Sequence, residues 1–295
     1  MAMTRRNKKA MEFATPKKQQ RSLGGTIGLA LLLFGMGTFM AFPLVYAITS
    51  AFKPPEEFFL FPPPIFPNNP TTENFQQLGL VISNMWISFE RYLFNSLFIS
   101  ITSTVAYLVF ATLAAYPLAK HEFPGKKGFN ELITLALMFT PAITAIPQYI
   151  ILAYLGLVDN PLGVLFPTLA STMGVFLCVQ YLEILPNAVL ESGRMDGAGE
   201  FRIWASIVVP NIKPVLFTMM IFQFQAVWNT TGANVIYNEA WKTLPAAMSQ
   251  VATAGIARAG VGSAAAIILM IPPILVFVIS QSNVMETMAH SGIKD

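Results

Sequence analysis

The chain has 295 residues, of which 54% are hydrophobic and only 11% are charged, and its formal net charge is +3. Soluble domains are roughly 45–50% apolar and about 25% charged, so this composition excludes an ordinary soluble enzyme. The mean hydropathy of +0.57 indicates a protein that lies largely in a membrane.

Six stretches of the sequence contain no Asp, Glu, Lys or Arg, and each is 23 to 28 residues long. About 20 apolar residues in a helix cross a hydrocarbon core, and a helix pairs its own backbone groups in lipid. We therefore predict an all-α polytopic membrane protein with six transmembrane helices. They fall within residues 26–52, 92–119, 132–158, 160–182, 214–238 and 259–285. The first stretch is longer than the ~7–15 residues of a signal-peptide core, and no A-x-A site closes it, which argues against a signal peptide.

Lys and Arg residues are distributed unevenly between the two sides of this predicted topology. With both termini in the cytoplasm, 14 of these residues lie on the cytoplasmic side and 4 outside. Cytoplasmic connections are enriched in Lys and Arg, so we predict this orientation, which also accounts for the net charge without a nucleic-acid partner. The predicted organisation is a basic tail (1–22), a six-span domain (23–285) with external loops 52–91 and 230–258 and a cytoplasmic charged segment (183–213), and a C-terminal tail (286–295).

The first external loop has two predicted parts. Pro54, Pro55 and three prolines at 62–64 favour an extended chain over residues 52–70. Beyond it, apolar residues recur every three or four positions and predict a helix. They are Phe75, Leu78, Ile82, Met85 and Phe89. This helix either lies on the outer membrane surface or a partner subunit, or packs on neighbouring spans.

Prolines and amides interrupt the apolar spans. Pro141, Pro147, Pro161 and Pro167 lie in or beside the third and fourth spans, and such prolines are tolerated where protein or a cavity replaces lipid. Amides in spans usually hydrogen-bond to other helices, and a minority line transport paths. The candidates for a translocation path are Gln148, Gln180, Gln223, Gln225 and Asn229.

Several kinds of functional motif are absent from the sequence. It contains no G-x-x-x-x-G-K-[ST], G-x-S-x-G or H-E-x-x-H pattern, so we expect no catalytic site and no ATP hydrolysis by this chain. His121 and His290 lack ligand spacing, and Cys178, the only cysteine, is expected to be a small packing residue. We therefore expect no metal or cofactor site. Ion-driven carriers usually bury charged groups, which these spans lack, so the energy source is expected outside the membrane core.

The charged segment lies between the fourth and fifth spans. Pro186 suits a first helical turn, and Asn187 to Met195 can follow as a helix. Asp196-Gly197 is a turn signal. A second helix is predicted to bury an apolar face and to be stopped by two prolines before the fifth span. That face comprises Phe201, Trp204, Ala205 and Val208, and the prolines are Pro210 and Pro214. The segment is either a solvated turn without a partner or a projection that a soluble partner binds.

The charged segment resembles the EAA motif of ABC-importer permeases. That pattern has an acidic residue and two small residues, then Gly-Ala, and further on Ile-x-x-Pro. The matching residues here are Glu191, Ser192, Gly193, Asp196, Gly197, Ala198, Ile207 and Pro210. Ser192 and Gly193 replace two alanines of the pattern. With its predicted spans, the chain is similar to a carbohydrate-uptake permease of the maltose type.

This resemblance implies a type I ABC importer fold in a bacterial inner membrane. It implies a second permease subunit, two cytoplasmic ATPase subunits that bind ATP and Mg, and an extracytoplasmic binding protein that delivers a carbohydrate. The charged segment would be the coupling segment that contacts the ATPase. The C-terminal residues Ser291, Gly292 and Lys294 would contact it as well. An importer of a non-sugar solute is the alternative, and an ATP-independent channel or facilitator is a more distant one.

Overall fold

A computed structural model describes residues 23–230, 232, 235–252, 255 and 258–291. Within these ranges the chain forms helices joined by turns and loops, without a strand. Contacts divide the chain into one unit up to Tyr46 and a second from Ala47 onward. The first unit contains most of helix α2 (Leu23–Ala51), which is apolar along its 29 residues and long enough to cross a membrane.

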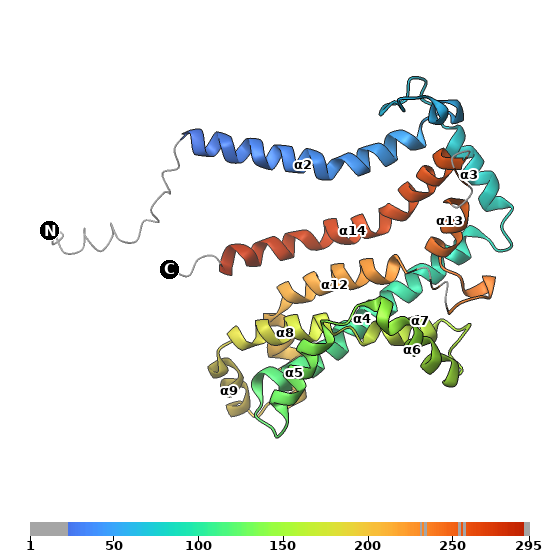
Figure 1. Cartoon of the computed structure of the whole chain (residues 1–295). Helices are drawn as coiled ribbons and strands as arrows, with labels where there is room; N and C mark the ends of the chain where they lie inside the picture. The colour runs from blue at the N-terminus through green and yellow to red at the C-terminus, as the bar shows by residue number, and fades with distance from the viewer. Residues whose placement is uncertain (1–22, 231, 233–234, 253–254, 256–257, 292–295) are drawn as a thin grey trace. The chain divides into compact units, whose positions relative to one another are not determined.

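The second unit contains the remaining helices (Figure 1). In chain order they are η1 (Pro55–Phe59), α3 (Glu73–Ser83), α4 (Phe89–Lys120), α5 (Lys126–Ala136), α6 (Pro141–Tyr154), α7 (Leu162–Leu169), α8 (Thr172–Ile184), α9 (Asn187–Met195), α10 (Glu200–Ile203), η2 (Trp204–Val208), α11 (Val209–Asn211), α12 (Lys213–Trp228), η3 (Glu239–Trp241), α13 (Leu244–Ala252) and α14 (Ala259–Ser291).

Four helical stretches of the described residues are long and apolar enough to span a membrane, and a fifth counts if a bent pair forms one span. They are α2, α4, α7 with α8, and α14, while the bent pair is α10–α11 with α12. The six predicted helices are therefore not all continuous. The third stretch is divided into α5 and α6 because Thr140 is extended before Pro141, and proline disfavours helical backbone in the preceding residue.

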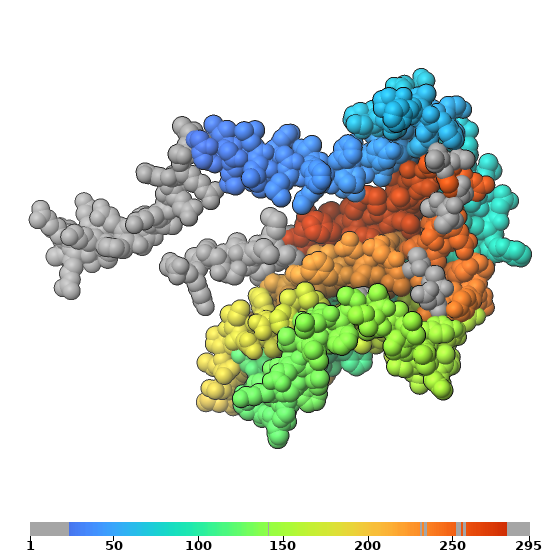
Figure 2. All heavy atoms as spheres, in the orientation of Figure 1, coloured from blue at the N-terminus to red at the C-terminus, as the bar shows by residue number. Residues whose placement is uncertain are grey.

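Side-chain hydrogen bonds define two ends of the second unit. At one end, Lys120 Nζ donates to the carbonyl of Leu185 at 2.6 Å. At the other, Asn95 Nδ2 donates to the carbonyls of Ala240 and Lys242 at 2.9 and 3.1 Å. Figures 1 and 2 show α5 and α9 at the first end, the α9 end, and Figure 1 shows α3 and α13 at the second, the α13 end. The connections predicted to be cytoplasmic thus separate from those predicted to be external.

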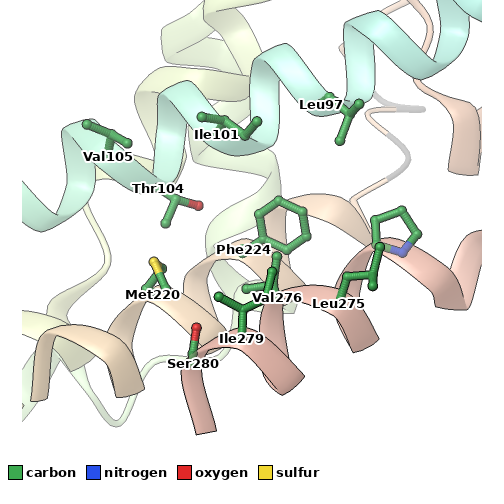
Figure 3. A pocket seen from close by; sticks show the side chains of 11 residues that line it. Leu97, Ile101, Thr104, Val105, Met220, Phe224, Leu275, Val276, Ile279 and Ser280 are labelled. Atoms are coloured by element: carbon green, nitrogen blue, oxygen red, sulfur yellow. The ribbon is translucent and has the colours of Figure 1, made fainter. Parts of the chain in front are cut away.

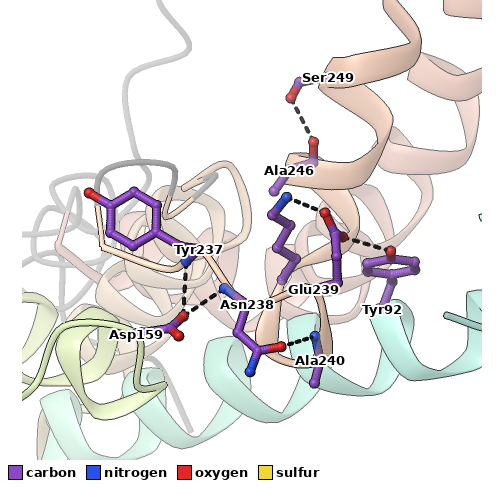
Figure 4. A network of polar contacts seen from close by, with 9 residues as sticks. Tyr92, Asp159, Tyr237, Asn238, Glu239, Ala240, Ala246 and Ser249 are labelled. Atoms are coloured by element: carbon purple, nitrogen blue, oxygen red, sulfur yellow. Dashed lines mark hydrogen bonds and ion pairs between the residues drawn. The ribbon is translucent and has the colours of Figure 1, made fainter. Parts of the chain in front are cut away.

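A polar network joins the connections at the α13 end (Figure 4). Asp159 Oδ1, between α6 and α7, accepts hydrogen bonds from the backbone N–H groups of Tyr237 and Asn238 at 3.0 and 2.7 Å. Tyr92 OH, at the start of α4, donates to Glu239 Oε2 at 3.0 Å. Two connections and the start of α4, which are distant in sequence, are therefore tied together at one end of the bundle.

The proline-rich loop contains more structure than predicted. One turn of 3₁₀ helix, η1, begins at Pro55, because proline fits the first position of a helical turn. The buried carboxylate of Glu57 accepts hydrogen bonds from the backbone of Asn68 and Asn69 at 3.0–3.1 Å. Lys53, also buried, donates to the carbonyl of Pro64. The prediction of a wholly extended loop was wrong, although no long helix forms.

Helix α3 is shorter than its apolar pattern suggested. It ends at Ser83 rather than near Phe89. Leu78 is 1% exposed, and Phe75, Ile82 and Met85 pack in the same core as residues of α13 and α14. The predicted packing of this helix on neighbouring helices is therefore confirmed.

A second core lies near the α9 end and includes Cys178. This residue is fully buried, and its Sγ lies 3.2 Å from Sδ of Met219. The prediction that Cys178 is a small packing residue is confirmed. The core joins α4, α8, α12 and the helices of the charged segment.

Candidate coupling site

Helix α9 begins and ends as predicted, at Asn187 and Met195. Two backbone bonds of the Schellman arrangement close it: Gly197 N–H donates to Arg194 O, and Ala198 N–H donates to Gly193 O, both at 3.0 Å. Gly197 has a φ of +77°, which strongly favours glycine. A Cβ added there would meet no atom of this chain within 4 Å. The glycine is therefore required by backbone conformation rather than by packing within the chain.

A small residue is favoured at Gly193 for a different reason. It is buried, and a Cβ added there would lie 2.6 Å from Cδ1 of Ile207. The missing side chain lets α9 approach the second helix closely. Ser192, beside it, is exposed and donates to the carbonyl of Val189 at 2.9 Å. The two substitutions in the EAA pattern thus occupy different environments.

The second helix buries only part of the predicted face: Val208 is fully buried and Trp204 is partly buried. Phe201 is 70% exposed and Ala205 is exposed, whereas Ile203, Val208 and Ile212 are fully buried. The cause is a π-helical turn, Trp204–Val208, in which the N–H of Val209 donates to the carbonyl five residues earlier. A π turn adds one residue to the helical repeat. The buried positions therefore fall five and four residues apart, which a 3.6-residue pattern does not anticipate.

The predicted stop before the fifth span is confirmed, because the helix ends between Pro210 and Pro214. The helix continues through Pro210 to Asn211, and the chain bends by 81° before α12. A proline normally clashes with the carbonyl four residues earlier, and the wider π turn that precedes Pro210 relieves this clash. Pro214 lies in the first turn of α12, where proline is favoured.

The charged segment is anchored on one side and exposed on the other. Its buried apolar residues pack in one core with residues of α4 and α8. They are Leu190, Ile203, Val208 and Ile212. On the opposite side the motif residues Glu191, Ser192, Asp196 and Gly197 are exposed. The segment is therefore a supported projection rather than a loose turn.

The carboxylate of Glu200 connects the charged segment to α4. Oε1 accepts from Arg194 Nε at 2.9 Å, and Oε2 accepts from Tyr116 OH at 2.6 Å. His121 Nε2 lies 3.3 Å from Oε2. Hydrogen bonds from Arg194 and Tyr116 lower the pKa of the Glu200 carboxyl to about 2, so it remains ionised at physiological pH.

Sequence reasoning missed this cluster. His121 was considered only as a metal ligand, and Tyr116 lies in a charge-free span, where it gave no polar signal. The charge of Glu200 directly after the Gly197 turn was visible, but its partner on α4 lies 84 residues away in sequence. Only the fold brings these residues together.

The five candidate amides do not converge on one cavity. Gln223 is buried, and its Nε2 donates to the carbonyl of Thr168 at 2.9 Å. Gln148 lines a cavity of about 600 Å³ between α6 and α7, together with Thr144 and Phe166. The remaining three are exposed on the surface of this chain. They are Gln180, Gln225 and Asn229.

A separate crevice of about 320 Å³ lies between α4, α12 and α14 (Figure 3). Its lining is apolar except for the hydroxyls of Thr104 and Ser280. None of the five candidate amides lines it. Because a saccharide needs many hydrogen-bonding partners when it leaves water, this crevice does not suit one.

Ser291 is the last described residue of α14, and Gly292 and Lys294 lie outside the described residues.

Long apolar helices and a supported, charged helix–turn–helix projection are the features of a membrane protein. Comparison with known families identifies the class more closely. The family model of the binding-protein-dependent transport system inner membrane component matches residues 28–289. The chain therefore belongs to this family of transport permeases.

Similar curated proteins are permeases of several transport systems. The UgpE permease of the sn-glycerol-3-phosphate transport system of Rhizobium meliloti is 28% identical over 71% of this chain and 75% of its own length. The inner membrane ABC transporter permease YcjP of Escherichia coli is 25% identical over 96% and 100%. The AraQ permease for arabinooligosaccharides of Halalkalibacterium halodurans is 27% identical over 91% and 95%.

A solved structure shares the fold. A chain of a bacterial ABC transporter involved in import of the acidic polysaccharide alginate superposes with a TM-score of 0.73 and 22% identity. The match covers 91% of this chain and 99% of that one. The helical arrangement described above is thus that of an ABC importer permease.

Proposed function

We propose that this chain is one of two permease subunits in an ATP-driven carbohydrate importer. The observation that carries the proposal is the charged segment, which is anchored in the core of α4 and α8 and exposes its motif residues. The AraQ relative, whose name specifies arabinooligosaccharides, supports a saccharide substrate. A cytoplasmic ATPase subunit binds the segment. Movement of that subunit switches the permease between inward- and outward-facing states.

The contact with the ATPase has a polar and an apolar part. Glu191 is exposed and offers its carboxylate to basic groups of the ATPase. Met195 and Phe201 are 88% and 70% exposed on either side of the Gly197 turn. Large apolar side chains at such exposure are stabilised when a partner covers them. The C-terminal residues Ser291, Gly292 and Lys294 add a further contact.

The chain crosses the inner membrane six times in this proposal, with both termini in the cytoplasm. Helices α5 and α6 together form the third span, broken at Pro141, and α12 forms the fifth. The separation of polar connections between the α9 end and the α13 end supports this topology. The α9 end then faces the cytoplasm, and the α13 end faces the binding protein.

The other components supply energy and delivery. ATP and Mg bind to two separate ATPase subunits, since this sequence has no phosphate loop. An extracytoplasmic binding protein delivers the solute, and a second permease completes the path. Gln148, in the cavity between α6 and α7, is the amide of this chain best placed to contact a sugar.

A reconstituted complex tests the substrate class. ATP hydrolysis by the full assembly with its binding protein should rise with a neutral oligosaccharide, such as an arabinooligosaccharide. Stimulation by sn-glycerol-3-phosphate alone would favour the non-sugar alternative, for which the UgpE relative is the argument. Solute flux without ATP would instead indicate a channel or facilitator.

A further inference from the structure

Three polar side chains converge on Glu200 from different elements. Tyr116 comes from the last turns of α4, His121 from the residue after α4, and Arg194 from α9. Glu200 itself begins α10. The carboxylate therefore joins both helices of the charged segment to one long helix.

This cluster differs from an ordinary surface ion pair, which contributes little. Tyr116 is 5% exposed, so its hydroxyl is held by packing in the core. Its ring lies edge-on to His121, with centroids 5.0 Å apart. Charge-assisted hydrogen bonds are shorter and more directional than neutral ones. Two such bonds, to Tyr116 and Arg194, fix both oxygens of the Glu200 carboxylate.

Helix α4 continues from this cluster to the α13 end without a break over 32 residues. There Tyr92 donates to Glu239, and Asn95 donates to the carbonyls of Ala240 and Lys242. One continuous helix therefore has a hydrogen-bonded attachment at each end. A displacement of the charged segment can be transmitted along α4 to the loops at the opposite end through this attachment, which acts beside the bonds of Lys120 to Leu185 and Asn187.

We propose that Tyr116, Arg194 and Glu200 form a joint that makes α4 follow the charged segment during transport. Tyr116 and Glu200 are positioning residues, because they act through α4 rather than on the solute or on ATP. The inference rests on the proposed function of the charged segment. The competing explanation is that the apolar core around Ile203 and Val208 holds the segment to α4 without help from the joint.

The test uses the complete importer with Tyr116→Phe and Glu200→Gln. Tyr116→Phe removes one hydroxyl and keeps the buried ring, while Glu200→Gln removes the charge of a half-exposed side chain. We expect both variants to retain the ATPase and its basal hydrolysis, but to move about tenfold less solute per ATP hydrolysed, within the range of known coupling energies. The double variant should lose no more than the more affected single variant, because both changes act on the bond between Tyr116 and Glu200.

Two matched controls accompany these variants. Tyr181→Phe alters a tyrosine of α8 that packs on the same core, and among the described residues its hydroxyl makes no hydrogen bond. Glu122→Gln alters a 90% exposed acid paired with Lys126 in the neighbouring connection. Both controls should transport solute with the normal ATP ratio.

The outcomes separate this inference from the proposed function. If wild type shows no ATP-driven uptake, the proposed function fails. If wild type transports and both joint variants keep the normal ratio, the joint is overturned and the function stands. Loss of the ATPase from either variant, or an equal loss of coupling in Tyr181→Phe, also overturns the joint. If Tyr116→Phe lowers the amount of permease in the membrane, the ratio of solute to ATP in Glu200→Gln alone tests the joint.

Discussion

The backbone N–H of Ala198 donates to the carbonyl of Gly193 at 3.0 Å, across the left-handed residue Gly197. This bond satisfies a carbonyl at the end of α9 and fixes the direction in which the chain leaves the helix. The bond therefore fixes the angle between the two helices of the charged segment. A partner that pushes on this turn moves both helices together.

Substitutions at Gly197 should separate backbone strain from a close approach of the ATPase. Gly197→Pro cannot adopt a φ of +77° and loses the bond to Arg194 O, so uptake should be abolished. Gly197→Val should lower uptake strongly through ~1–2 kcal/mol of strain. Gly197→Asn, which tolerates this conformation, should retain most activity. Uptake and ATPase pull-down measure each variant.

Gly199→Ala is the control, since Gly199 has a φ of −72° and open space around its Cβ position. If Gly197→Asn is as inactive as Gly197→Val, with normal membrane levels, then the ATPase approaches the glycine directly and strain is not the reason.

Reversal of charge at Glu191 should weaken the contact with the ATPase. Glu191 is exposed on α9, and Glu191→Lys would place a positive charge against basic groups of the partner. We expect about a tenfold or greater loss of ATPase binding, ~1.4 kcal/mol or more, without loss of permease from the membrane. Glu183→Lys, an exposed acid at the end of α8, serves as the control. Equal ATPase retention in both variants would contradict the role of Glu191.

Gly193 should accept one added carbon but not three. Gly193→Ala places a Cβ 2.6 Å from the terminal carbon of Ile207, a flexible side-chain end that can rotate away. Gly193→Val cannot be accommodated in this way and should destabilise the permease by ~1–3 kcal/mol through overpacking. Thermal unfolding of the purified permease measures both. Equal stability of the valine variant and wild type would show that α9 is not packed this closely.

Substitution of Gln223 should change the stability of the permease, whereas substitution of Gln148 should change the KM for uptake. Gln223→Leu removes a buried hydrogen bond to Thr168 and should lower stability by ~1 kcal/mol or less, with an unchanged KM for uptake. Gln148→Ala should raise the KM without a change in stability, because Gln148 is exposed to a cavity. Gln225→Leu is the exposed control on α12. An unchanged KM in Gln148→Ala would remove this residue from the transport path.

Single cysteines should report the orientation of the two ends. In a Cys178→Ser background, cysteines at Asn69 and Tyr237, both exposed at the α13 end, should react with an impermeant thiol reagent in intact cells. Cysteines at Lys127 and Gly199, exposed at the α9 end, should not react. Labelling at Lys127 before cell lysis would contradict the proposed topology.

The sequence by itself determined the membrane class, the α9 helix and the turn at Asp196-Gly197. Each rests on a local property: a run of uncharged residues, a proline at a helix start, or a glycine that can adopt a positive φ. These signals need no knowledge of the remaining chain. The same holds for Cys178, whose apolar surroundings are visible in its own span.

Only the tertiary structure decided which face of the second helix is buried and what holds it. The π turn at Trp204–Val208 buries Ile203 and Ile212 together with the predicted Val208, and a fixed period of 3.6 residues does not predict this set. The bond between Tyr116 and Glu200 joins residues 84 positions apart. Such contacts depend on how helices pack rather than on local spacing, so no pattern within either helix specifies them.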